Sequence, residues 1–324
     1  MLSRDVLVID ALTEAARIEL KIREQIQGQL RRTGAVVGLS GGVDSSVVAI
    51  LLARALGPER VLGLLMPERD SSPDALQLGL LAAEAAGIET LVEDVTPLLT
   101  AAGCYARQAH AIRSVFPEYG DGWRCKLSVP AISDGLKLPV PLLTVESPCG
   151  ERKSARMDAS SFRALVAATN FKQRARKMFE YHHADRLHYA VAGTPNLQEY
   201  ALGFFVKQGD GAADVKPIAH LYKVQVYALA AHLGVPDEIR RRPPTTDTYS
   251  LPQTQEEFYF ALPHADMDLC LWAYEHGIAA EELATALGIS SAHAARAYRD
   301  IEGKKRAVRY LDAPALLAAD MRGV

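Results

Sequence analysis

The order of hydrophobic and polar positions predicts a fold in which strands and helices alternate. Apolar residues recur at three- and four-residue spacing between Val8 and Ile26, which predicts a helix over residues 6–32. Short apolar runs bounded by Gly and Pro then predict buried strands, with helical patterns between them. The predicted buried strands are 34–39 and 61–66, and a third strand is predicted near 89–92. The predicted helices between them are 47–55 and 73–86. Because short loops join these elements, the connections are right-handed crossovers, and the fold class is α/β with a doubly wound parallel sheet.

The pattern changes after the third predicted strand. Residues 103–160 hold turn residues and mixed apolar runs, so we expect an irregular insertion there. Periodicity then predicts a helix at 160–187, a strand at 189–192 and a helix at 222–233. The tail, from about 264 to 324, is predicted to be helical, with breaks at Gly277 and Gly288. We therefore expect a single domain over 1–324 with a helical C-terminal part.

Composition narrows the class of protein. The chain has 324 residues, of which 49% are hydrophobic and 23% charged, so it can bury a sizeable core. Its formal net charge of -3 provides no overall positive field for nucleic acid or an anionic membrane, and we expect neither as a partner. The four cysteines form no CxxC pair, which favours a reducing cytoplasm over a disulfide scaffold. No uncharged run reaches the roughly 18 residues of a membrane span.

The strongest motif is Ser40-Gly41-Gly42-Val43-Asp44-Ser45-Ser46, between a predicted strand and a predicted helix. Glycines let the backbone pass close to a bulky anion, and the free N–H groups of the first helical turn point at it. The serines add hydroxyl donors. Asp44 repels phosphate unless a divalent cation lies between them, which indicates Mg²⁺. A glycine turn with a serine cap is the simpler interpretation, but it leaves the full string unexplained.

This motif resembles the PP-loop of ATP pyrophosphatases, enzymes that cleave ATP to AMP and pyrophosphate while they activate an oxygen of a second substrate. It lacks the Gly-Lys-Ser/Thr of the lysine-bearing nucleotide loop.

Further short motifs follow in a fixed order. They are Asn170-Phe171-Lys172-Gln173-Arg174-Ala175-Arg176, Gly193-Thr194-Pro195-Asn196-Leu197-Gln198-Glu199, Lys207-Gln208-Gly209-Asp210 with Asp214, Leu221-Tyr222-Lys223 and Pro244-Thr245-Thr246. With the loop, this set resembles NAD synthetase of the ammonia-dependent type, over roughly residues 10–100 and 165–310. The resemblance implies an adenine nucleotide alpha-hydrolase-like fold and a carbon–nitrogen ligase. It implies that ATP and Mg²⁺ activate the carboxylate of nicotinic acid adenine dinucleotide as an acyl-adenylate, which ammonia converts to the amide.

The resemblance also implies roles for individual residues. Asp44 and Lys223 are expected to be catalytic, Lys223 by stabilising charge on the transferring phosphate, and Asp44 and Glu199 are expected to bind the metal. The residues expected to contact ATP are Gly38, Leu39, Ser40, Gly41, Gly42, Val43, Asp44, Ser45, Ser46, Arg69, Thr194, Lys223 and Thr245. The residues expected to contact the dinucleotide are Arg174, Lys207, Asp214, Lys304 and Lys305. Members of the family are commonly homodimers, and this chain is too short for an added glutaminase domain, so it takes free ammonia or receives it from a separate glutaminase.

Several residues depart from the family pattern. Pro195, Leu197 and Gln198 replace the usual Gly, Lys and Ser, and Val206 replaces a Thr. We expect these positions to face the second substrate, which leaves open a PP-loop ligase that amidates a sugar acid or a natural-product acid. For that enzyme the 103–160 insertion would shape a different pocket.

Two simpler interpretations remain open. The segment 280–295 resembles a DNA-binding helix–turn–helix, although it carries few side chains that read bases. Lys172 and Lys177 belong to the same predicted helix as Arg174 and Arg176, which is also typical of a solvated basic face.

Overall fold

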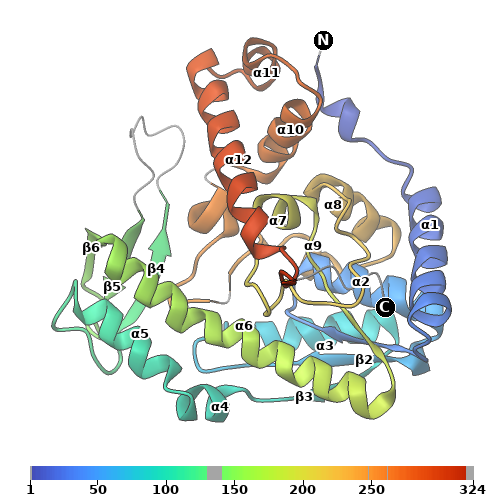
Figure 1. Ribbon diagram of the computed structural model, residues 1–324, viewed down its shortest axis with the longest axis horizontal. Coiled ribbons are helices and arrows are strands. Elements are labelled where there is room, and N and C mark those ends of the chain that lie inside the picture. The colour runs from blue at the N-terminus through green and yellow to red at the C-terminus, as the bar shows by residue number, and fades with distance from the viewer. Residues whose placement is uncertain (1, 130–140, 247, 261, 319–324) are drawn as a thin grey trace.

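The computed structural model describes residues 2–129, 141–246, 248–260 and 262–318. A central parallel sheet is covered by helices on both faces, and the C-terminal helices lie together above one end of it (Figure 1). The predicted doubly wound α/β fold is confirmed.

Four strands form the sheet, in the order β3-β2-β1-β7, and all neighbours are parallel. They are β1 (Ala35–Gly38), β2 (Val61–Leu65), β3 (Glu89–Val92) and β7 (Ala190–Ala192). β1 lies in the middle, with Ala35 opposite Val61 on one side and Ala190 on the other. The order places the ends of β1 and β7 side by side, although 150 residues of sequence separate them.

Side chains alternate between two hydrophobic layers. Val37 packs with α1 (Ala11–Arg23), α2 (Val43–Leu56), α3 (Ala75–Ala86) and α8 (Lys223–His232), whereas Val36 packs with α4 (Thr96–Ala101) and α6 (Ala159–Leu187). Since both faces of β1 are covered, its sequence is apolar throughout rather than alternating.

The predicted helix over 6–32 is divided in the structure. A 3₁₀ turn, η1 (Arg4–Leu7), comes first, and α1 begins only at Ala11 because the Asp10 carboxylate accepts hydrogen bonds from the N–H groups of Leu12 and Thr13. The helix then widens into the π turn η2 (Glu24–Gln29).

The expected irregular insertion contains regular structure, so that prediction was wrong for much of it. α5 (Cys104–Arg113) packs along α6, and β4 (Arg124–Ser128), β5 (Leu142–Glu146) and β6 (Arg152–Arg156) form a separate antiparallel sheet. Residues 130–140 of the insertion lie outside the described residues. The sheet was missed because β6 is charged and exposed along most of its length, while β4 alternates lysine and arginine with buried residues.

The tail is helical as predicted, with α10 (His264–Glu275), α11 (Ala280–Leu287) and α12 (Ser291–Leu311). Gly277 and Gly288 end α10 and α11 with positive φ angles. The apolar faces of these helices form one core around Leu283, Ala294 and Ile301, so the helix–turn–helix pattern is accounted for by packing. The remaining short elements are η3 (Pro58–Arg60), α7 (Leu197–Leu202), α9 (Asp237–Arg240) and η5 (Glu256–Phe260).

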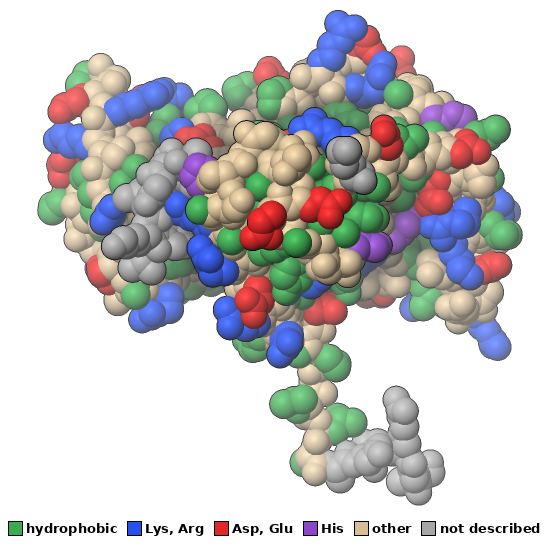
Figure 2. Space-filling view, turned by 90° about the horizontal axis from the view of Figure 1, so that it is seen from above, with side chains coloured by type: hydrophobic (Ala, Val, Ile, Leu, Met, Phe, Trp, Pro, Cys, Tyr) green, Lys and Arg blue, Asp and Glu red, His purple; other side chains and the backbone are tan. Residues whose placement is uncertain are grey.

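The surface carries mixed charge. On the face seen in Figure 2, basic and acidic side chains are interspersed. Ion pairs between acidic and basic side chains of the described structure include Arg4–Asp266 and Lys305–Glu275. None of the helices in the described part of the chain is long and apolar enough to cross a membrane.

Gly41, in the connection from β1 to α2, is a position where the fold requires glycine. Its φ is +75°, and a Cβ there would lie 2.7 Å from Leu78 Cβ and 3.0 Å from the Ala75 carbonyl. We expect Gly41→Ala to lower the free energy of unfolding by about 2–3 kcal/mol, measured by urea denaturation. Gly87→Ala is the control, since Gly87 has a φ of +68° but open space around it and should lose only about 1 kcal/mol. Equal losses in the two variants would show that the close packing against α3 is unimportant.

Candidate active site

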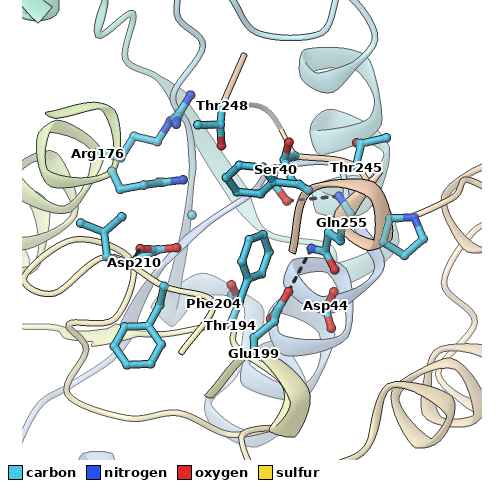
Figure 3. Close-up of a pocket in the computed structure, with 18 of the residues that line it drawn as sticks. Ser40, Asp44, Arg176, Thr194, Glu199, Phe204, Asp210, Thr245, Thr248 and Gln255 are labelled. Atoms are coloured by element: carbon cyan, nitrogen blue, oxygen red, sulfur yellow. Dashed lines mark hydrogen bonds between the residues drawn. The ribbon is translucent and has the colours of Figure 1, made fainter. Parts of the chain in front are cut away.

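A cavity of about 1190 Å³ opens at the carboxyl ends of β1, β2 and β7. This is the edge where open α/β sheets bind ligands. The volume exceeds the range of a single drug-sized ligand, so the cavity has room for two substrates side by side. Its wall includes the loop after β1, the loop after β2, the start of α7 and residues 242–246, 248 and 249. Figure 3 shows Ser40, Glu199, Thr245 and Thr248 in this wall.

The loop after β1 is preformed by its own serines. Ser45 Oγ and Ser46 Oγ donate to the Gly42 carbonyl at 3.1 and 2.9 Å, and Ser40 Oγ accepts from the Gly42 N–H at 3.3 Å. Gly42 is the N-cap of α2 and supplies no capping side chain, so the first turn keeps free N–H donors. The loop therefore fixes a helix N-terminus suited to an anion.

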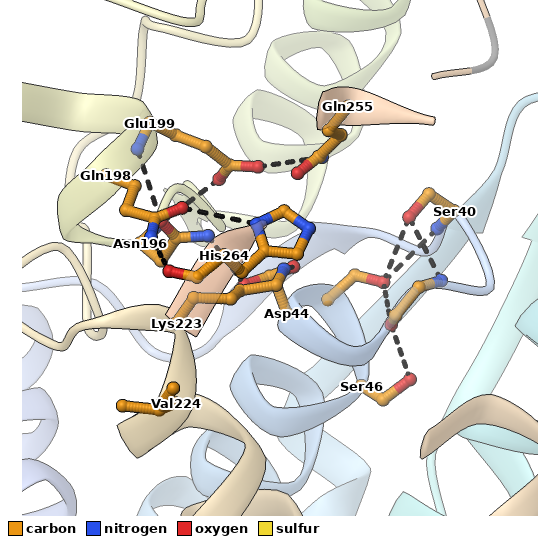
Figure 4. A network of polar contacts seen from close by, with 12 residues as sticks. Ser40, Asp44, Ser46, Asn196, Gln198, Glu199, Lys223, Val224, Gln255 and His264 are labelled. Atoms are coloured by element: carbon orange, nitrogen blue, oxygen red, sulfur yellow. Dashed lines mark hydrogen bonds and ion pairs between the residues drawn. The ribbon is translucent and has the colours of Figure 1, made fainter. Parts of the chain in front are cut away.

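Asp44 lies at this N-terminus, opposite Lys223 of α8. Lys223 Nζ donates to Asp44 Oδ2, and the Lys223 side chain is fully buried (Figure 4). Asn196 Nδ2 donates to the other Asp44 oxygen at 3.0 Å. The β1–α2 loop, the N-cap of α7 and the first turn of α8 thus meet at one carboxylate.

Glu199 completes the group of charged side chains. Its Oε2 accepts from the Asn196 N–H at 3.1 Å in a capping box, and its Oε1 accepts from Gln255 Nε2 at 3.0 Å. Burial, and then the negative charge of Asp44, raise the pKa of the Glu199 carboxyl. Burial opposes the charge of Lys223, but the carboxylates of Asp44 and Glu199 outweigh it and raise the pKa of Lys223.

The donor set fits a divalent cation of the magnesium type. Mg²⁺ is usually held by one or two carboxylates together with substrate phosphates and water, and Asp44 and Glu199 are two such carboxylates beside a phosphate loop. Gln255 Oε1 is a buried oxygen without a hydrogen-bond partner in the described structure. No third His, Cys, Asp or Glu joins them among the described residues, so these groups form no site for a metal bound by protein ligands alone.

The backbone of Lys223 is held by a second carboxylate. Asp268 of α10 accepts from the N–H groups of Lys223 and Val224 at 3.1 and 2.8 Å, and from Gln198 Nε2 at 2.6 Å. Gln198 is buried and faces α10, and Leu197 packs against the C-terminal core. The expectation that all departures from the family pattern face the second substrate is therefore wrong for these two positions. Pro195 and Val206 do line the cavity.

The structure brings together most of the predicted ATP residues. Gly38 to Ser45, Thr194, Lys223 and Thr245 all line the cavity. Ser46 faces away, because its hydroxyl bonds to Gly42 and its side chain is buried in α2. Arg69 also lies outside the wall: its guanidinium stacks 3.7 Å from the centre of the Tyr105 ring and pairs with Asp70.

Only two of the predicted dinucleotide residues line the cavity. They are Arg174, whose Nε donates to the Lys207 carbonyl at 3.3 Å, and Lys207, whose Nζ donates to the carbonyls of Tyr310 and Ala313. Asp214 instead accepts from the Val191 N–H of β7 at 2.8 Å. Lys304 is held by Asp300 and the Tyr259 carbonyl, and Lys305 by Glu275.

Several lining residues received no role from the sequence. Arg176 donates to the Met66 carbonyl, Arg242 donates to Ser72 Oγ, and Asp210 and Glu180 are acids in the same wall. Burial raises the pKa of Asp210. Arg176 belongs to the same motif as Arg174, and Arg242 lies two residues before the Pro244-Thr245-Thr246 motif. Their nearness to these motifs was the feature of the sequence that could have identified them as cavity residues. The expected solvated face is absent at Lys172 and Lys177, which are both buried.

The stability of the fold should depend on pH through His264 of α10, whose Nδ1 donates to Gln198 Oε1 at 3.3 Å. Burial, and then the charge of Lys223, lower the pKa of His264 to about 4, below its ordinary value. As the pH falls, the unfolded chain therefore binds a proton at His264 before the folded chain does. The contribution of neutral His264 to the free energy of unfolding is complete above about pH 6.5 and is lost as the pH falls through 4. Measured by urea denaturation between pH 4 and 7.5, wild type should lose up to about 3 kcal/mol more than His264→Gln. If the free energy of unfolding changed with pH equally in the two proteins, a neutral buried His264 would be contradicted. Asp268, whose raised pKa affects stability with the opposite sign, is present in both proteins.

Comparisons with known proteins agree with this geometry. The family model described as NAD synthase matches residues 14–115 and 134–306, more than half of the chain. The chain is 56% identical over 315 residues to an NH₃-dependent NAD⁺ synthetase of Mesorhizobium japonicum, covering 97% of this chain and 99% of the relative. It is 54% identical to the enzyme of that name from Rhizobium meliloti, covering 95% of this chain and 92% of the relative.

Solved structures share the fold. An NMN synthetase from Francisella tularensis superposes with a TM-score of 0.65 at 21% identity, covering 96% of this chain and 99% of that one. An NH₃-dependent NAD synthetase from Campylobacter jejuni gives a TM-score of 0.62 at 22% identity, covering 95% and 100%. At such identities the likeness concerns the fold alone, whereas the family model and the closely similar sequences carry the assignment. The chain belongs to the NAD synthase family.

Proposed function

We propose that this chain is an ammonia-using NAD synthetase, which amidates nicotinic acid adenine dinucleotide with ATP. The observation that carries the proposal is the fully buried Lys223–Asp44 pair beside Glu199, at a preformed phosphate loop. The relatives at 54–56% identity, which are named NH₃-dependent NAD⁺ synthetases, support the same reaction and favour the dinucleotide over sugar acids or natural-product acids.

The reaction has two steps. A carboxylate oxygen of the nicotinate attacks the α-phosphorus of ATP, the bond to the β-phosphate oxygen breaks, and pyrophosphate leaves. Ammonia then attacks the carbonyl carbon of the acyl-adenylate, loses a proton, and displaces AMP. Neither step requires a protein nucleophile, so the protein acts by positioning reactants and by offsetting charge.

The chain's own residues suit these tasks. The free N–H groups at the start of α2 bind phosphate oxygens, and Lys223 offsets negative charge where phosphate is transferred, since its ammonium is buried and aimed at Asp44. Asp44 and Glu199 would hold Mg²⁺, which would supply further positive charge beside the phosphates. Arg174 and Lys207 are the cations at the cavity wall that can contact the dinucleotide.

The resemblance also supports a homodimer that acts in the cytoplasm. It further supports ammonia as the nitrogen source, taken free from solution or from a separate glutaminase. Asp214, Lys304 and Lys305 have structural partners within the chain, so their role toward the dinucleotide rests on the resemblance alone.

The assay that tests the function measures pyrophosphate release from ATP and Mg²⁺ with the dinucleotide and each nitrogen source. Ammonium should support turnover and glutamine alone should not, because a thioester-forming glutaminase site is no part of the cavity wall described here. The control omits the dinucleotide. ATP binding without pyrophosphate release in the complete mixture would remove the dinucleotide as substrate, and turnover with glutamine alone would reveal an unrecognised glutaminase.

Asp44→Asn tests the carboxylate at the phosphate loop. We expect kcat/KM to fall at least about 100-fold, because the variant loses both a metal ligand and the counter-charge of Lys223. Asp10→Asn is the control, since Asp10 only caps α1 and should keep full activity. Retention of more than about a tenth of the wild-type rate, with an unchanged melting temperature, would argue against the metal role.

A further inference from the structure

A second fully buried lysine lies just behind the cavity wall. Lys172 of α6 is 1% exposed and, with Lys223, is among the largest fully buried side chains in the described structure. Asp44 and the proposed reaction account for Lys223. Lys172 does not line the cavity, although its neighbours Thr169 and Gln173 do. The reaction outlined above gives it no task, and burying an ammonium group is costly unless it is fully paired.

All three donors of the Lys172 ammonium are used. Nζ donates to Glu68 Oε1 at 2.8 Å, to Asp70 Oδ2 at 2.8 Å and to the Thr248 carbonyl at 2.9 Å. Glu68 uses its other oxygen to accept from Tyr105 OH of α5 at 2.8 Å. One side chain therefore joins α6 to the loop after β2 and to Thr248, while Tyr105 of the 103–160 insertion bonds to Glu68.

The two segments that Lys172 joins both form cavity wall. Glu68, Ser71 and Ser72 line it from the loop after β2, and Thr245, Thr246 and Thr248 line it from the other segment. A second contact links the same two segments, because Arg242 donates to Ser72 Oγ at 3.0 Å. Thr245 is thus held between one link at Arg242 and another at Thr248, and it faces the cavity that the Ser40 loop also borders (Figure 3).

Charge balance alone does not explain the third hydrogen bond. Glu68 and Asp70 supply two negative charges, and Arg69 pairs with Asp70 at 3.2 Å, so the four groups are neutral without any contribution from Thr248. Burial opposes the negative charge of Asp70, but the charges and hydrogen bonds of Lys172 and Arg69 together outweigh it and lower the pKa of Asp70. The bond to the Thr248 carbonyl adds no compensating charge, and its effect is to fix the backbone of the segment that carries Thr245.

We propose that Lys172 is a positioning residue for the nucleotide, which holds the backbone at Thr248 against the loop after β2 and so preforms the ATP side of the cavity. The inference rests on the proposed function for the identity of the nucleotide.

The test separates this tether from charge compensation. Lys172→Met/Asp70→Asn removes the tether and one opposing charge together, and it leaves Glu68 in the cavity wall with its hydrogen bond from Tyr105. We expect the Kd of ATP, measured by calorimetry, and the KM for ATP to rise about tenfold, the effect of losing one hydrogen bond from a charged group. The KM for the dinucleotide and kcat at saturating ATP should change less than about twofold, a split that general loss of structure would not produce.

Tyr105→Phe is the matched control. It removes one hydrogen bond from the same network but leaves Lys172 bonded to Thr248, so the Kd of ATP should stay within about twofold of wild type. If the double variant does not fold, Lys172→Gln/Asp70→Asn replaces it, because the polar amide removes the same two charges and has only two N–H donors in place of three. An unchanged Kd of ATP in the folded variant, or an equal rise in Tyr105→Phe, would overturn the proposal. Because calorimetry needs no turnover, this result stays separate from the pyrophosphate assay, whose failure in wild type would overturn the proposed function instead.

Discussion

The active-site architecture depends on one buried ion pair, between Lys223 of α8 and Asp44 of α2. An ammonium group withdrawn from water is costly unless a carboxylate lies against it, and removing either partner leaves the other charge uncompensated. The pair therefore requires the N-termini of α2 and α8 to meet at a fixed distance. Both helices contribute to the same hydrophobic core, through residues such as Val47 and Leu51 of α2 and Val226 and Leu229 of α8. Packing on one face of the sheet thus determines the geometry of charge at its edge.

The position of Lys223 is electrostatically unfavourable by itself. It is the first residue of α8, where the helix dipole is positive and a cation is disfavoured. Two carboxylates from outside the helix offset this: Asp44 faces the side chain, and Asp268 accepts the first two backbone N–H groups. Asp268 belongs to α10, so the C-terminal helices contribute to the site although they lie outside the α/β layers (Figure 1). Gln198, bonded to Asp268, connects this cap to the helix that carries Glu199.

The sequence predicted those parts of the molecule that are specified locally. Three of the four parallel strands, β1, β2 and β7, are short apolar runs, and the Ser40–Ser46 loop is a contiguous motif, so pattern alone located them. The antiparallel sheet of the insertion was missed because its short strands carry charged residues on exposed faces. Contacts between distant residues could not be predicted either. Nothing near Asp214 in the sequence indicates that its carboxylate bonds to β7, and nothing near Arg69 indicates that it stacks on Tyr105.

Contacts between residues that are distant in sequence also bear on how the second substrate is held. Lys207 was expected to meet the dinucleotide, yet two of its three donors already bond to carbonyl groups beyond the end of α12 or within its last turn. A phosphate at Lys207 must therefore use the remaining donor or displace the C-terminal segment. Arg174 is committed only through Nε, to the Lys207 carbonyl, which leaves its terminal nitrogens without a partner among the described residues. Since a guanidinium can bind a phosphate through two parallel hydrogen bonds, Arg174 is the better preorganised cation, and Lys207 contributes to the site mainly by holding the end of α12 beside it.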